Sequence, residues 1–212
     1  MKARKLTKKP LPSQHICVYT AAILYFQVQF CKIIIRNGKM DKEMNAGDVF
    51  NIRPALESEC GLILNFIKEL AEFEKLLHEV EATEEMIRKN VFEERIAEVV
   101  FAELNGRPIG FALFFHNFST FVGKPGIYLE DLFVKPEYRG KGFGKRLLIY
   151  LAQLAKERGC GRFEWAVLNW NEKAISFYKS LGARPMYKWT VYRLDGTDLD
   201  KVASLPATGS GK

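Results

Sequence analysis

An apolar run, a glycine-rich turn and a helical pattern follow one another without a gap in residues 127–155. The run Ile127–Val134 is apolar on both faces apart from two carboxylates, which is typical of a buried strand. The turn that follows, "YRGKGFGKR", holds three glycines within five residues. From Phe143 onwards apolar residues recur with helical spacing, and Gly159 ends the helix. A strand, a glycine turn and a helix in this order form a general anion site, because the turn and the helix N-terminus present backbone N–H groups.

The spacing of the glycines excludes two common nucleotide loops. The phosphate loop of nucleotide triphosphatases needs a Gly-Lys pair followed by Ser or Thr, whereas Lys145 is followed by Arg146. The dinucleotide fingerprint needs GxGxxG, whereas these glycines run GxGxG at Gly140, Gly142 and Gly144. Taken by itself, the turn fits either a site for another anion or a tight turn whose lysines face water.

The remaining pattern predicts a mixed α/β sheet. A hairpin is predicted around Asn105-Gly106, a dipeptide typical of two-residue turns, although a longer turn also fits. Thr83 suits the N-cap of a helix. The predicted strands are 48–55, 97–104, 107–118, 127–134, 162–168 and 187–194, and the predicted helices are 57–73, 83–92, 143–155 and 171–181. An antiparallel hairpin followed by alternating strands and helices is the order found in mixed sheets.

The charge of the chain is unevenly distributed. Its 212 residues are 48% hydrophobic, which suffices for one domain with its own core. The formal charge of +7 lies in residues 1–47, which hold nine Lys or Arg against Asp41 and Glu43, and the remainder is balanced at 23 of each sign. A nucleic-acid-binding domain needs a basic face on its folded part, so no nucleic-acid partner is expected. We expect a basic and apolar extension in 1–47, one domain in 48–204 and a flexible tail in 205–212.

The extension reads as a basic segment followed by an apolar one. Its purest apolar stretch, Ile16–Phe26, is about 11 residues long and too short to span a bilayer as a helix. A membrane partner is therefore not expected. A targeting or membrane-surface segment, a disordered tail, and a translated leader before a start at Met40 or Met44 all remain open.

The cysteines and histidines predict neither a disulfide framework nor a metal site. No two cysteines form a CxxC pair, and no Cys and His share the spacing of a metal site. The residues concerned are Cys17, Cys31, Cys60, Cys160, His15, His78 and His116. A reduced, cytoplasmic setting without a structural metal is the expectation.

Several stretches together resemble the GNAT acetyltransferase superfamily. Arg139-x-x-Gly142-x-Gly144 matches its R/Q-x-x-G-x-G/A signature, "YLEDLFVKPEYRGKGFGKRLL" surrounds it, and "WNEKAISFYKSLGA" follows about 25 residues later. With "IRPA" and "KELAEFE" nearer the N-terminus, the chain resembles the diamine (spermidine/spermine) N-acetyltransferases over roughly Val49–Ala203. The resemblance implies an α/β GNAT fold, with a mostly antiparallel central sheet, a splayed strand pair and flanking helices. It also implies acetyl-CoA as the acyl donor and a homodimer.

Acetyl transfer to an amine needs a base for the amine, donors for the carbonyl oxygen and an acid for the thiolate. Glu130 and Asp131 are neighbours in the predicted strand and point to opposite faces unless a bulge intervenes. Carboxylates in an apolar strand are costly without a partner, which a cationic amine would be, and one satisfied buried carboxylate is the alternative. The resemblance implies that Glu130 accepts the amine proton, that Asp131 helps bind the cation, and that Tyr178 protonates the thiolate. Ordinary aromatic packing is the alternative for Tyr178.

The resemblance also implies which residues contact the two substrates. Phe73 and Glu74 match positions that line the amine site, although Glu74 at a helix end also fits a solvated carboxylate. Asn171 matches a coenzyme A contact and also fits a plain helix N-cap. The implied coenzyme A contacts are Leu132, Phe133, Val134, Arg139, Gly140, Lys141, Gly142, Phe143, Gly144, Lys145, Asn171, Ala174 and Tyr178.

One departure from the family pattern bears on the substrate. Lys188 precedes Trp189 where related sequences carry an acidic residue, and a cation there would repel a polycation. A diamine, a short polyamine or a thialysine-like amino acid is therefore expected. Direct attack within a ternary complex is expected, because the nearby thiol of Cys160 is not at the splayed strand. The alternatives are acetylation of protein lysines or N-termini, a non-catalytic acyl-CoA-binding regulator, and a nucleic-acid or anionic-membrane binder acting through residues 1–47.

Overall fold

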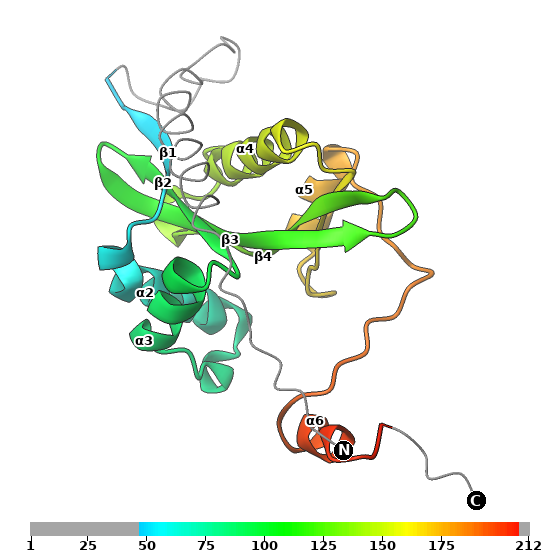
Figure 1. The fold of residues 1–212 in the computed structure, drawn as a ribbon. Helices are drawn as coiled ribbons and strands as arrows, with labels where there is room; N and C mark the ends of the chain where they lie inside the picture. The colour runs from blue at the N-terminus through cyan, green and yellow to red at the C-terminus, as the bar shows by residue number, and fades with distance from the viewer. Residues whose placement is uncertain (1–46, 208–212) are drawn as a thin grey trace, which may run out of the picture. The chain divides into compact units, whose positions relative to one another are not determined.

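The structure is a computed structural model that describes residues 47–207 (Figure 1). The strands are β1 (Phe50–Pro54), β2 (Glu98–Leu104), β3 (Arg107–Ser119), β4 (Lys124–Val134) and β5 (Arg162–Trp165). The helices are α2 (Cys60–Glu74), α3 (Glu84–Ile87), α4 (Phe143–Glu157), α5 (Glu172–Ser180) and α6 (Gly196–Ala203). Short helical turns are η1 (Glu57–Glu59), η2 (Leu77–Glu79), η3 (Arg88–Glu93) and η4 (Pro136–Tyr138). The predicted extension, apart from Gly47, lies outside the described residues.

The five strands form one sheet in the order β1-β2-β3-β4-β5. β1 pairs antiparallel with β2, and β4 pairs in parallel with β5. This confirms the predicted mixed α/β sheet. The pairing of β4 with β5 ends with Leu129 opposite Trp165, one residue before Glu130. It therefore stops at the point where the resemblance implies that the two strands splay apart.

Contacts divide the chain into two compact units, which we describe separately. Of the described residues, the first unit contains 47–113 together with Asp131–Leu154. The second unit contains Phe114–Glu130 and residues 155–207. β3 and β4 each pass from one unit to the other. Glu130 and Asp131 are therefore neighbours in sequence that belong to different units.

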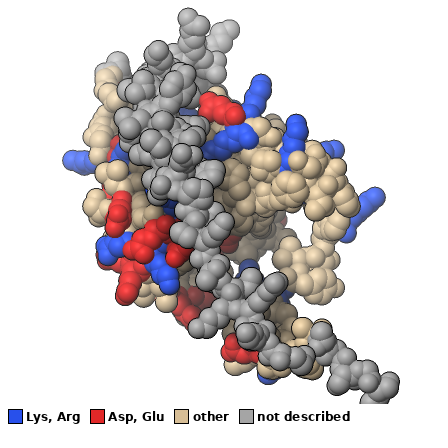
Figure 2. All heavy atoms as spheres, in the orientation of Figure 1, with Lys and Arg blue, Asp and Glu red and all other residues tan. Residues whose placement is uncertain are grey.

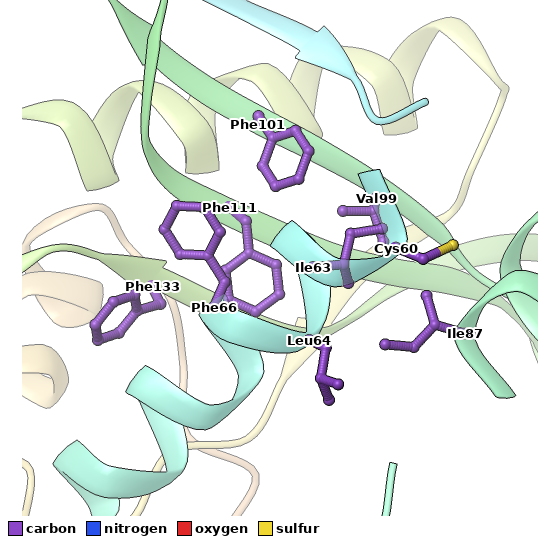
Figure 3. Close-up of a cluster of buried hydrophobic side chains, with 9 residues drawn as sticks. All are labelled: Cys60, Ile63, Leu64, Phe66, Ile87, Val99, Phe101, Phe111 and Phe133. Atoms are coloured by element: carbon purple, nitrogen blue, oxygen red, sulfur yellow. The ribbon is translucent and has the colours of Figure 1, made fainter. Parts of the chain in front are cut away.

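The core of the first unit lies between α2 and the strands (Figure 3). Phe66 of α2 is 1% exposed, and the centre of its ring lies 5.3 Å from that of Phe111 and 5.6 Å from that of Phe101. The other members of this cluster are Cys60, Ile63, Leu64, Ile87, Val99 and Phe133. In Figure 1, α4 covers the opposite face of the sheet from α2 and α3. The apolar stripe of each helix is thus buried against one face of the same strands.

Two local sequence signals predicted the boundaries in the first unit. Thr83 Oγ1 accepts a hydrogen bond from Met86 N at 3.2 Å, so Thr83 is the N-cap that its residue type indicates. Asn105 and Gly106 have φ of 53° and 75° and join β2 to β3 directly, so the hairpin turn has two residues. The predicted second helix is only partly α-helical, because α3 continues as the wider π-helical turn η3.

The last predicted strand is wrong. Residues 187–194 contain no strand, and Tyr187, Trp189, Val191 and Tyr192 are each at least 70% exposed. β5 also ends at Trp165 instead of residue 168. Aromatic and β-branched residues in this segment indicate that it suits a strand, but a strand also needs a neighbouring edge to pair with. The sequence pattern shows that the residue types suit a strand, but it does not show whether a strand edge is available for pairing.

Candidate active site

The glycine loop of the first unit connects the end of β4 to the start of α4. Gly140 and Gly142 have φ of 79° and 80°, a conformation that residues with a Cβ rarely adopt. A Cβ built on either glycine would meet no atom within 4 Å, so the space in front of this backbone is open. The first helical hydrogen bond runs from Arg146 N to Gly142 O at 3.1 Å. The N–H groups of residues 143–145 precede it and have no partner inside the helix.

Gly144 differs from the other two glycines of the loop. Its φ is not positive, and a Cβ there would lie 3.7 Å from Leu132 Cδ2 and 3.8 Å from Val134 Cγ2, which are ordinary contact distances. The backbone conformation therefore requires glycine at Gly140 and Gly142 but not at Gly144.

Arg139 opens the loop, and its side chain is directed toward aromatic rings. Its Nε donates a hydrogen bond to Val134 O at 2.8 Å. Its guanidinium carbon lies 4.4 Å from the ring centre of Phe73 and 5.0 Å from that of Phe133. Burial lowers the pKa of Arg139, and the carboxylate of Glu137 opposes this shift. The structure thus brings a residue implied for coenzyme A next to Phe73, which is implied for the amine.

The other three cationic side chains of the loop differ from Arg139 in their exposure and contacts. Lys141 is exposed, and its Nζ lies 5.8 Å from the ring centre of Tyr138. Lys145 is half-buried in the first turn of α4. The guanidinium carbon of Arg146 lies 5.1 Å from the ring centre of Phe50 on β1. Two lysines on the loop are therefore available to add positive charge beside its backbone N–H groups.

The C-terminal end of α2 carries the two residues implied for the amine. Lys75 ends the helix with a left-handed φ of 64°. Phe73 is 40% exposed, and Glu74 is half-buried. Burial raises the pKa of Glu74, as expected for a carboxylate partly removed from water. Asp131 of β4 is half-buried and lies two residues before Phe133, so both side chains point to the sheet face that packs against α2.

The second unit holds Tyr178 and Asn171 on α5. The ring centre of Tyr178 lies 5.1 Å from that of Trp165 in an edge-to-face contact and 5.3 Å from that of Phe177. Burial raises the pKa of Tyr178, so its phenol keeps its proton. Asn171 Oδ1 accepts a hydrogen bond from Ala174 N at 3.2 Å. Asn171 is thus the N-cap of α5, and this bond does not use its side-chain N–H groups.

Glu130 is exposed at the end of the β4–β5 pairing. Tyr128 lies two residues earlier and therefore on the same strand face. The pKa of Tyr128 is raised by burial and further by the carboxylates of Glu130 and Glu164, while Arg193 opposes the shift. Sequence reasoning did not select Tyr128 or Trp165. The i, i+2 spacing from Glu130 would have indicated Tyr128, whereas nothing in the sequence indicates the Trp165–Tyr178 contact.

The described residues offer neither a metal-binding cluster nor a membrane-spanning helix. Within residues 47–207, no three His, Cys, Asp or Glu side chains are grouped so that they could hold a metal ion. No helix in this range is both long and apolar enough to cross a membrane.

Comparison with known proteins assigns the chain to a family. The family described as "Acetyltransferase (GNAT) family" matches residues 64–183, which is more than half of the chain. This chain belongs to the GNAT acetyltransferase family. It is an N-acetyltransferase, and enzymes of this family use acetyl-CoA as the acyl donor.

Two relatives and one solved structure are similar over most of the chain. A thialysine N-epsilon-acetyltransferase of Sus scrofa is 41% identical over 166 residues, which cover 72% of this chain and 96% of that protein. Spermidine/spermine N(1)-acetyltransferase-like protein 1 of Homo sapiens is 31% identical over 74% of this chain and 24% of that protein. An integron cassette protein from the mobile metagenome of V. cholerae has a TM-score of 0.63 at 28% identity, covering 74% of this chain and 98% of its own. These similarities confirm the family that the motifs indicated.

Proposed function

We propose that this enzyme transfers the acetyl group of acetyl-CoA to a primary amine of a small cationic substrate. The substrate is a diamine, a short polyamine or a thialysine-like amino acid. The observation that carries the proposal is the 41% identity to a thialysine N-epsilon-acetyltransferase, which extends over 96% of that protein. The residues that the chemistry needs, Glu130, Asp131 and Tyr178, are all present in this chain.

Coenzyme A is proposed to bind mainly through the backbone of the glycine loop. The open space in front of Gly140 and Gly142 supports a pyrophosphate there, because the loop N–H groups and the dipole of α4 both favour an anion. The exposed Lys141 and the half-buried Lys145 add charge. Backbone groups of Leu132–Val134 are proposed to contact the pantetheine arm. In the second unit, Asn171, Ala174 and Tyr178 are the proposed contacts.

The acid and base roles are proposed from the environment of each side chain. Glu130 is exposed and lies where β4 has lost its pairing with β5, so its carboxylate can accept the amine proton directly or through a water. The free amine nitrogen then forms a bond to the thioester carbonyl carbon, and the carbon–sulfur bond breaks. Tyr178 gives its phenolic proton to the leaving sulfur, and the second proton lost by the nitrogen restores the phenol through water. Its raised pKa supports this role, because the phenol carries a proton throughout the neutral range.

The amine is proposed to contact Phe73, Glu74 and Asp131. A cationic substrate would offset the cost of the partly buried carboxylate of Glu74, whose pKa burial raises. The exposed Lys188 supports a small substrate over a long polycation, because it carries a positive charge where the resemblance implies an acidic residue.

A panel of amines tests the proposed substrate class. Coenzyme A release would be measured for the full chain with thialysine, lysine, ornithine, putrescine, spermidine, spermine and a lysine-containing peptide. We expect the highest kcat/KM for an amine in the first five and a value at least about tenfold lower for the peptide. Turnover of the peptide alone would contradict the proposal and would favour a protein acetyltransferase.

A homodimer is also proposed. Six apolar side chains between residues 186 and 194 support it, because so many exposed large apolar groups in one short run mark an interaction surface. They are Met186, Tyr187, Trp189, Val191, Tyr192 and Leu194. Light scattering of the full chain at micromolar concentration should give the mass of two chains. The double variant Trp189→Ser, Val191→Asp should give the mass of one, and an unchanged mass would exclude this surface.

The enzyme is proposed to lie in the cytoplasm and to need no nucleic-acid partner. A cytoplasmic location is supported by Cys60 and Cys160, which are both free thiols. The balanced charge of residues 48–212 supports an enzyme that needs no nucleic-acid partner. On the face shown in Figure 2, acidic and basic side chains are intermixed over α2 and α3. A single acetyltransferase domain is proposed in residues 48–204.

A further inference from the structure

The first turn after β4 is tied to helix α2 by two cations. Lys135, directly after the strand, forms a salt bridge from Nζ to Glu69 Oε1 at 3.1 Å, and its Nζ lies 5.2 Å from the ring centre of Phe66. Arg139, at the other end of η4, places its guanidinium 4.4 Å from the ring centre of Phe73. Residues 66, 69 and 73 are spaced as i, i+3 and i+7, so they lie along one face of α2.

The segment between these two cations is closed by its own hydrogen bonds. Tyr138 N donates to Lys135 O at 2.9 Å, and Arg139 N donates to Pro136 O at 3.1 Å. Arg139 Nε then donates back to Val134 O at 2.8 Å, which joins the start of the glycine loop to the last residue of β4. The backbone of Arg139 leaves this turn in an extended conformation, with φ of −71° and ψ of 159°, and leads straight into Gly140.

We propose that Arg139 is a positioning residue, which fixes the entry of the coenzyme A loop by clamping it to the end of α2, and that its charge is not a main ligand of the pyrophosphate. This inference rests on the proposed function, because it assumes that the glycine loop holds coenzyme A. Phe73, at the end of α2, is the other half of the clamp. A residue implied for the amine therefore also determines how the chain holds its acyl donor.

A clamp and a phosphate ligand respond differently to substitution. Lysine keeps the charge of Arg139 but has no planar group to stack on Phe73 and Phe133 while it donates to Val134 O. A phosphate ligand is served by either cation, since both attract a phosphate. Phe73 has no charge, so replacing its ring affects a clamp and leaves a phosphate ligand in place. Losing a cation–π contact of this kind changes an equilibrium constant by roughly two- to thirtyfold, which is enough to be measured.

The test is coenzyme A binding by calorimetry on the full chain, with no amine and no turnover required. The variants are Arg139→Lys, Arg139→Gln, Phe73→Leu and the double variant Arg139→Gln, Phe73→Leu. Arg158→Gln is the matched control, because its guanidinium carbon also lies over an aromatic ring, 5.9 Å from the centre of Phe114, and Arg158 follows the opposite end of α4 from the glycine loop. Thermal unfolding of each variant shows whether it is folded.

The clamp predicts that Arg139→Lys and Arg139→Gln weaken coenzyme A to a similar degree, by about tenfold, and that Phe73→Leu weakens it by at least about threefold. The double variant should bind no worse than Arg139→Gln, because one broken clamp cannot be broken twice. Arg158→Gln should bind like the wild type. Retained affinity in Arg139→Lys together with unchanged affinity in Phe73→Leu would overturn the inference and leave the proposed function intact. A wild-type chain that does not bind coenzyme A would overturn both.

Discussion

The glycines of the loop show at the scale of single residues which part of a motif the backbone demands. Gly140 and Gly142 occupy a left-handed conformation with open space before them, whereas Gly144 lies in the first turn of α4 with an ordinary φ. A signature of three glycines does not distinguish these cases. We therefore expect a side chain at Gly140 or Gly142 to be more damaging than one at Gly144.

The first prediction compares Gly142 with Gly144. Gly142→Ala places a Cβ on a backbone at φ 80° and in the space proposed for pyrophosphate, so the affinity for coenzyme A should fall by at least about tenfold. Gly144→Ala adds only an ordinary contact with Leu132 and Val134 and should change the affinity by less than about threefold. Calorimetry on the two variants decides. Equal losses would mean that the bound group approaches Gly144 as closely as it approaches Gly142.

The second prediction separates the proposed acid from the proposed base by pH. Tyr178→Phe should lower turnover by about 10²–10⁴ from pH 7 to pH 10, because alkali cannot replace a missing proton donor. Glu130→Gln should show a deficit that shrinks as pH rises, because free amine becomes more abundant without help from the enzyme. The measurement is kcat/KM for both variants over that range. Wild-type turnover in Tyr178→Phe would make Tyr178 a packing residue.

The raised pKa of Tyr178 also bears on stability. Between the usual phenol pKa near 10 and the higher folded-state pKa, the folded chain holds a proton that the unfolded chain has lost. The free energy of unfolding should therefore fall as pH rises above about 10, and Tyr178→Phe should remove that part of the decline. Urea unfolding at pH 9 and pH 10.5 measures the difference between the two chains. An identical decline in both would show that this phenol is not the group concerned.

At the scale of elements, α2 supports both the core and the proposed amine site. Phe66 fills the space between β2, β3 and β4, and Phe73 is two turns further along the same helix. Glu69 and Lys135 hold the middle of the helix to the end of β4. The same helix therefore joins the core of the first unit to the proposed amine site.

The fourth prediction tests the role of α2 in the core. Phe66→Ala should lower the free energy of unfolding by about 3–5 kcal/mol, because it opens a cavity among the rings of the cluster. The matched control is Phe118→Ala at a 61% exposed position of β3, which should change it by less than about 0.5 kcal/mol. Urea unfolding of the two variants gives both values. Comparable losses would show that the buried cluster does not dominate the stability of the chain.

The sequence predicts helix boundaries well where they depend on residues close together in the chain. Thr83 and Asn171 cap helices because their side-chain oxygens reach a backbone N–H three residues on, which the residue type alone indicates. Residues 187–194 were predicted as a strand and are not one, because pairing depends on a distant edge. The position of Arg139 against Phe73 could not be predicted either, since the two are 66 residues apart and only the fold brings them together. The sequence signature identifies the glycine loop. Only the structure shows that the side chain of Arg139 is directed to Phe73, while the backbone of the loop faces open space.

At the scale of the whole molecule, the excess positive charge is confined to residues 1–47, while all of the proposed site residues lie beyond them. The fifth prediction is that a chain starting at Met44 keeps its kcat/KM within about tenfold of the full chain. The measurement is coenzyme A release with the best amine of the panel. A larger loss would show that the basic segment takes part in catalysis.

In the proposed reaction, acetyl passes from acetyl-CoA directly to a small amine. Mass spectrometry of a mixture of the full chain, acetyl-CoA and thialysine tests it most directly, with Glu130→Gln and Tyr178→Phe run beside it. We predict N-acetylated thialysine with the wild type, a much slower appearance with each variant, and no acetyl group left on the protein when the amine is omitted. A stable acetyl-enzyme would contradict direct transfer, and no acetylated product from thialysine or any other small amine would contradict the proposed substrate class.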